Sequence, residues 1–121
     1  MKNFLKTIPL FFIALVVGNN VIAQEYADPT KVLENGKAPG LKVKVLSKTN
    51  STTTYMLIFA KGDEVVAGLT EFARRYTIKS GSFSGIGDAL SAKAGWFDYK
   101  RKKFKIIPID TAEVTSFSGD I

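Results

Sequence analysis

Residues 61–76 read KGDEVVAGLTEFARRY, and their apolar residues recur at helical spacing, which predicts the main helix of the fold. We predict Asp63 as the N-cap, with Glu64 in the first turn, where the helix dipole favours a negative charge. Gly68 weakens a helix by about 1 kcal/mol relative to Ala, so we expect another segment to pack closely there. The predicted apolar stripe consists of Val65, Val66, Leu69, Phe72, Ala73 and Tyr76.

Strand patterns precede this helix. The segment LKVKVL (41–46) alternates apolar and basic residues, which predicts a half-buried strand. Its inward residues are then Leu41, Val43 and Val45. The segment TYMLIFA (54–60) is apolar on both faces, which predicts a central strand.

More strand patterns follow the helix. A polar turn at residues 100–102 predicts a hairpin between two of them. Two strands, one helix and several further strands, without a repeated βαβ unit, predict an α+β fold with a mostly antiparallel sheet. The later strand segments are IKSGSFSGIG (78–87), AGWFDY (94–99), KFKIIPI (103–109) and TAEVTSFSGDI (111–121).

Composition restricts the chemistry that the protein can perform. The chain has 121 residues, a formal net charge of +6, and neither Cys nor His. It therefore lacks disulfides, thiolate or imidazole metal ligands, and imidazole acid–base catalysis. We expect a single domain that acts as a non-catalytic binding module and has no cofactor held by this chain alone.

The N-terminus predicts export. Lys2 and Lys6 precede the apolar run IPLFFIALVV (8–17), and a small-residue site follows at Ala23. This is the layout of a cleaved signal peptide over residues 1–23, and the run is too short for a permanent membrane span. We therefore expect a periplasmic or secreted protein.

Two further segments complete the domain organisation. Residues 24–40 mix prolines, glycines and charges, which predicts a flexible N-terminal segment. Residues 41–121 are then the folded domain.

Several motifs in that domain resemble one family. They are the helix start Gly62-Asp63-Glu64; the strand residues Ser80, Gly81, Phe83, Ile86 and Gly87; the aromatic strand Trp96, Phe97 and Tyr99; and the E-x-x-S-x-x-G pattern of Glu113, Ser116 and Gly119. In this order they resemble the plants and prokaryotes conserved (PPC) domain, over about residues 42–121. The resemblance implies an α+β domain that assembles as a homotrimer and binds DNA. No Arg-Gly-Arg core of an AT-hook occurs in the chain.

The resemblance also implies an alternative function. Bacterial members continue past E-x-x-S-x-x-G with a histidine-rich segment, so we expect this chain to lack the C-terminal part of the domain. The alternative is an exported trimer that binds a divalent metal or a small ligand, or acts as an enzyme, with its His site beyond Ile121. Glu113 would be a second partner of that metal.

Two groups of residues in the chain are candidate sites. One group is the glycine run of Gly81, Gly85 and Gly87, which lacks the Gly-Lys-Ser/Thr ending of a phosphate loop. We expect these glycines to permit β-bulges in a strand or close approach of another backbone segment. A basic cluster next to Tyr99 and Phe104 could neutralise phosphates while the aromatic rings stack on bases, or it could be a solvated turn that prevents edge pairing. The cluster consists of Lys100, Arg101, Lys102, Lys103 and Lys105.

Overall fold

The structure is a computed structural model that describes residues 23–121, so the predicted signal peptide lies outside the described residues except for Ala23. Every strand pair in the described chain is antiparallel, in sheets of order β1-β6-β5, β2-β3 and β4-β7. The predicted α+β fold is confirmed. The elements are β1 (Tyr26–Ala27), β2 (Lys42–Lys48), β3 (Thr53–Ile58), α1 (Val65–Arg75), β4 (Ser82–Ala89), β5 (Ala92–Asp98), β6 (Lys103–Ile109) and β7 (Ala112–Asp120).

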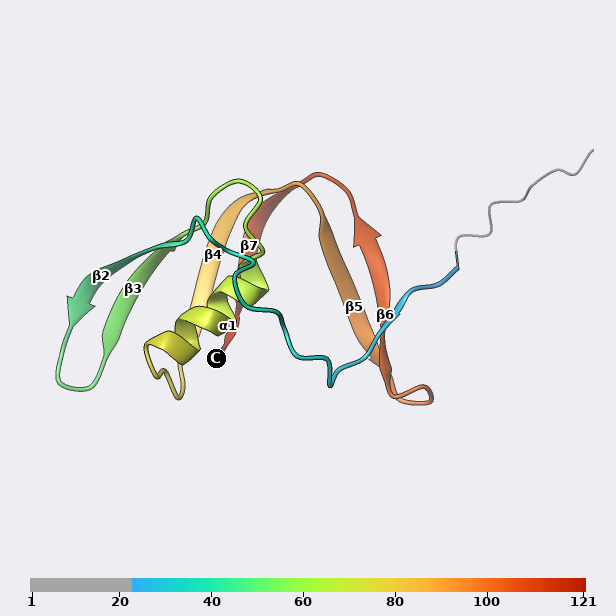
Figure 1. Ribbon diagram of the computed structural model, residues 1–121, viewed down its shortest axis with the longest axis horizontal. Helices are drawn as coiled ribbons and strands as arrows, with labels where there is room; N and C mark the ends of the chain where they lie inside the picture. Colours follow the sequence, from blue (N-terminus) through green and yellow to red (C-terminus); the bar gives the residue numbers. More distant parts are fainter. Residues whose placement is uncertain (1–22) are drawn as a thin grey trace, which may run out of the picture.

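Residues 82–120 form one long antiparallel hairpin that bends in its middle. Ala89 faces Ala112 before the bend, and Ala92 faces Ile109 after it, so the two ladders continue in one register. Figure 1 shows the result as an arch, with β4 and β7 on one side and β5 and β6 on the other. We call the β5–β6 half, with its connecting turn, the arm. The arm lies apart from α1 and the β2–β3 hairpin (Figure 1).

Helix α1 packs against the β2–β3 hairpin. The ring of Phe72 is 5% exposed and lies 5.1 Å from the ring of Tyr55 on β3, edge to face, with Tyr76 beside both. A Cβ built on Gly68 would lie 2.6 Å from Phe59 Cε1 and 2.7 Å from Ala38 Cβ. The predicted close packing at Gly68 is thus confirmed. The buried residues of the described chain lie in α1 and in β6: Ala67, Gly68, Phe72 and Ile106.

The helix begins one residue later than the sequence predicts. Glu64 is the N-cap, and its carboxylate accepts hydrogen bonds from the backbone N–H groups of Val66 and Ala67. The prediction of Asp63 as N-cap is wrong. The Asp63 carboxylate instead accepts hydrogen bonds from Gly40 N at 3.1 Å and Ala60 N at 2.9 Å. These bonds join the two ends of the β2–β3 hairpin, so Asp63 stabilises the entry to the helix.

The prediction of a central strand at residues 54–60 is also wrong. In the described chain β3 pairs with β2 alone, and its outward side chains Met56 and Ile58 are 43% and 52% exposed. The apolar pattern predicted covered faces on both sides, whereas the described chain supplies a layer on one side only. Val45, predicted to point inward, is likewise exposed, and the β2–β3 ladder shifts register just after it, between Val45 and Ser47.

The segment 24–40 connects the arm to the helix. Its strand β1, which the sequence did not indicate, pairs with β6. Further along, Gly36 N donates a hydrogen bond to Glu71 Oε2 at 3.0 Å, and Glu64 N donates one to Lys37 O at 2.9 Å. Figure 1 shows this segment running from the arm to α1.

Candidate nucleic-acid interface

The predicted basic cluster lies at the free end of the arm. Residues 99–102 form the turn between β5 and β6, which confirms the predicted hairpin. Lys103 and Lys105 follow on β6 and face Asp98 and Trp96 of β5. Figure 1 shows that this turn is the end of the arm, remote from the bend. The structure therefore brings all five predicted cations to one exposed end of the molecule.

Asp98 organises the turn. Its Oδ1 atom accepts hydrogen bonds from the backbone N–H groups of Lys100 at 2.9 Å and Arg101 at 3.1 Å. Its Oδ2 atom lies 3.0 Å from Nη1 of Arg101. The Arg101 backbone bond, and then its side-chain bond, lower the pKa of Asp98. Lys102 adopts a φ of 52°, the left-handed conformation that closes this turn at the cost of mild strain for a residue with a Cβ.

The five cations differ in what they contact. Arg101 forms the ion pair with Asp98, and its guanidinium carbon lies 5.2 Å from the centre of the Tyr26 ring. The ammonium of Lys105 lies 5.1 Å from the centre of the Trp96 ring. Within residues 23–121, the side chains of Lys100, Lys102 and Lys103 form no ion pair. Among the described residues these three exposed lysines have no ion-pair partner within contact distance, although Lys103 is close enough to Asp28 to help lower the pKa of that carboxyl group.

Aromatic side chains lie on both faces of the arm. Phe97 packs edge to face with Tyr99 at 5.2 Å and with Phe104 at 5.3 Å, and the Tyr99 side chain is 83% exposed. The opposite face carries Trp96 and Tyr26, because both residues lie directly across from Lys105. Sequence reasoning predicted Tyr99 and Phe104 beside the cations and missed these two. Strand alternation could have placed Trp96 beside Lys105, whereas nothing in the sequence places Tyr26 there.

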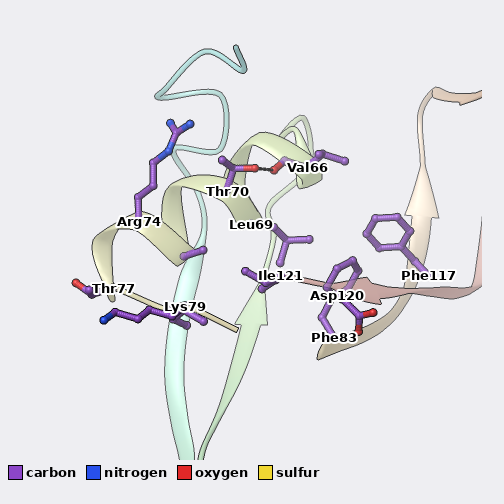
Figure 2. Close-up of a pocket in the computed structure, with 12 residues that line it drawn as sticks. Val66, Leu69, Thr70, Arg74, Thr77, Lys79, Phe83, Phe117, Asp120 and Ile121 are labelled. Atoms are coloured by element: carbon purple, nitrogen blue, oxygen red, sulfur yellow. Dashed lines mark hydrogen bonds between the residues drawn. The ribbon is translucent and has the colours of Figure 1, made fainter. Parts of the chain in front are cut away.

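A separate apolar groove lies between α1 and the β4–β7 ladder. Its volume is about 590 Å³. Figure 2 shows Leu69 and Phe83 turned toward it and the Arg74 side chain pointing away. The rings of Phe83 and Phe117 lie 5.2 Å apart along its floor. The lining is mainly aliphatic and aromatic, with Arg74, Lys79 and Asp120 among its polar residues, so the groove offers mainly apolar contact. Its apolar lining consists of Val66, Leu69, Ala73, Ile78, Phe83, Phe117 and Ile121.

The predicted glycine positions have structural roles. The β4–β7 ladder shifts register between Gly85 and Gly87, which confirms the predicted bulge. Gly81 exchanges two backbone hydrogen bonds with Ile121, at 2.8 and 3.2 Å. Gly119 of the family pattern lies under the Phe83 ring, where a Cβ would come within 2.9 Å of Phe83 Cζ. These glycines therefore permit the irregular ladder and its close packing.

The other two residues of that pattern lie on β7. Ser116 falls in the irregular part of the ladder, and Glu113 faces Asp88 on β4. Among residues 23–121, no three His, Cys, Asp or Glu side chains come together as a metal site would require. The Asp88–Glu113 pair is thus a cross-strand pair of like charges on an exposed ladder.

The fold and the arm define a small α+β domain built from antiparallel hairpins around a helix. The family model of the Plants and Prokaryotes Conserved (PCC) domain, the same domain as PPC, matches residues 46–121, which is more than half of the chain. The chain belongs to this family, as its motifs predicted. Comparison with curated proteins and with solved structures found no match. In the part of the chain that the structure describes, no helix has the length and apolar character to cross a membrane.

Proposed function

We propose that the protein is an exported, non-catalytic binding module that assembles as a homotrimer and binds DNA at the end of the arm. The observation that carries this proposal is the turn itself, where Lys100, Lys102 and Lys103 project without an ion pair in the described chain. Neutralisation of phosphates by such cations releases counterions and supplies sequence-independent affinity. The DNA binding that the family resemblance implies agrees with this proposal, as does the net charge of +4 that remains when residues 1–23, with Lys2 and Lys6, are removed from the +6 of the full chain.

The local geometry supports a binding surface more strongly than it supports a merely solvated turn. Asp98 neutralises one cation only, and its hydrogen bonds to the backbone keep the turn folded. A folded turn holds the lysine backbones in fixed positions, so less conformational entropy is lost when their side chains meet an anion. The exposed Tyr99 ring adds an aromatic surface beside them.

Binding of labelled DNA to the purified protein tests this proposal. Replacing Lys100, Lys102 and Lys103 together by Ala should weaken DNA binding. The slope of log K against log salt should become less negative by about 2.7, because each phosphate contact contributes about −0.9 to that slope. The control replaces Lys42, Lys44 and Lys48 of β2 by Ala, which removes the same charge from exposed positions elsewhere. The proposal would be contradicted if both variants weakened DNA binding equally, or if the binding constant did not depend on salt concentration.

A further inference from the structure

A row of three side chains crosses one face of the β1-β6-β5 sheet. Tyr26 on β1 lies directly opposite Lys105 on β6, and Lys105 lies directly opposite Trp96 on β5. Directly opposed residues of antiparallel strands point to the same face of a sheet. The row therefore presents two aromatic rings with a cation between them, close to the basic turn. We call it the Tyr26–Lys105–Trp96 row.

This row is exposed at Trp96, whereas Tyr26 and Lys105 are half-buried. The Trp96 side chain is 51% exposed, and Ile107 and Ile109 on the same face are exposed as well. The cations already associate with the rings, as the Lys105–Trp96 and Arg101–Tyr26 distances show. A lysine has a long flexible side chain, so Lys105 can move from the ring face to an anion without any change in the backbone.

We propose that the Tyr26–Lys105–Trp96 row selects single-stranded nucleic acid by stacking unpaired bases on its two rings, an inference that rests on the proposed function. Neighbouring strands lie about 4.8 Å apart, so rings on β1 and β5 are separated by roughly 10 Å. Two bases can stack on the two rings at that spacing while the backbone between them passes over Lys105. The lysine then neutralises the connecting phosphate.

The same geometry disfavours a duplex. In double-stranded DNA the faces of the bases stack on one another, so a ring reaches a base face only if the duplex is locally unstacked. A duplex can still meet the lysines of the turn through its phosphates. It gains nothing from Tyr26 or Trp96. Single strands of equal length should therefore bind more tightly, although a duplex carries more charge.

The other face of the arm is a less suitable stacking surface. Phe97 lies between Tyr99 and Phe104 and contacts each of them edge to face. Its ring is thus engaged by other rings. Phe104 also lies opposite Ala27 and next to Lys105 along β6, with its side chain on the reverse face. Phe104 therefore provides a matched aromatic control for the row.

Intrinsic fluorescence tests the inference directly, because Trp96 is the single tryptophan of the chain. The purified protein is titrated with oligothymidylate of about 12 nucleotides, and separately with a duplex of equal length. The single strand should quench Trp96 as a base stacks on it and should bind about tenfold more tightly than the duplex. Heparin, a polyanion without bases, should bind without comparable quenching.

Variants assign the effect to the row. Trp96→Leu and Tyr26→Leu should each lower the affinity for a labelled single strand by about tenfold and leave duplex affinity within about twofold. Trp96→Phe should retain most of the single-strand affinity, and Phe104→Leu should change it less than twofold. Circular dichroism and the unfolding midpoint report whether each variant is folded. A folded Trp96→Leu variant with unchanged single-strand affinity would overturn the inference.

The outcomes separate this inference from the proposed function. If neither single strand nor duplex binds, the proposed function fails and the inference fails with it. If the duplex binds as tightly as the single strand, or heparin quenches Trp96 equally, the proposed polyanion site stands and base stacking is refuted. Tighter single-strand binding with quenching, lost in Trp96→Leu and retained in Phe104→Leu, supports both.

Discussion

At Gly68 the helix comes into contact with two other segments. We predict that Gly68→Ala lowers the free energy of unfolding by about 1–2 kcal/mol. Alanine improves helix propensity by about 1 kcal/mol, but overpacking costs typically 1–3 kcal/mol. The built Cβ lies 2.6 Å from Phe59 Cε1 and 2.7 Å from Ala38 Cβ, closer than real Cβ contacts, so overpacking should exceed the gain. Denaturant unfolding of both proteins measures the difference.

The control for this variant is another glycine. Gly81→Ala places its Cβ 3.8 Å from Ile78 Cγ2, which is an ordinary contact, and Gly81 lies outside the helix. Its free energy of unfolding should change by less than about 0.5 kcal/mol. A Gly68→Ala protein more stable than the wild type would show that Ala38 and Phe59 move aside easily, contrary to the packing described above.

Single residues also show how far the sequence could predict the site. The five cations are consecutive or nearly so along the chain, so their clustering at a turn followed from local pattern. Tyr26 lies next to Lys105 because a strand of two residues adds to the edge of the sheet. A pairing so short leaves no periodicity in the sequence, and the contact joins residues nearly 80 positions apart. Non-local contacts of this kind require the three-dimensional structure.

At the scale of elements, the β5–β6 turn depends on one carboxylate. Hydrogen bonds from Arg101 and Lys100 lower the pKa of Asp98 below the usual aspartate value of about 3.9. A lowered pKa in the folded turn means that Asp98 stabilises it above about pH 4, and that this contribution is lost as pH falls through the lowered pKa. We predict that the amides of Lys100 and Arg101 lose protection from hydrogen exchange on acidification, as NMR would show.

Two variants test the role of Asp98. Asp98→Asn should weaken the turn at neutral pH and remove its dependence on acid, because an amide does not titrate in this range. Asp110→Asn, just after β6 and outside the turn, should leave the acid response intact. An unchanged acid response in Asp98→Asn would assign the titration to another group.

The boundaries of the elements separate what local sequence determines from what it does not. Strand β6 has the predicted bounds, and α1 occupies the predicted stretch, because alternation and helical periodicity are local signals. The N-cap was misassigned because Asp63 and Glu64 are adjacent acidic residues. The Asp63 carboxylate is hydrogen-bonded to the backbone N–H groups of Gly40 and Ala60, which leaves Glu64 as the N-cap. Strand β3 was wrongly predicted to be central because an apolar pattern shows that a face can be buried but does not show which segment covers that face.

At the scale of the whole molecule, much apolar surface of the described chain is exposed. Met56 and Ile58 on β3, and the groove beside α1, lie open to solvent. Extensive exposed apolar surface often marks a site of association. The proposed homotrimer accounts for it, since the faces that the single chain leaves uncovered would meet another copy. Assembly would then supply stability that the small core of α1 and Ile106 does not.

We predict that the exported protein begins at Gln24 and has three times the mass of one mature chain. The signal-peptide layout predicts cleavage after Ala23, and the exposed apolar faces favour association in water. Intact-mass analysis of material recovered outside the cytoplasm gives the start, and light scattering gives the assembly. Because association stabilises the folded state by mass action, the thermal midpoint should rise with protein concentration. A monomer with a constant midpoint would refute the trimer, and an intact residue 1 in exported material would refute cleavage.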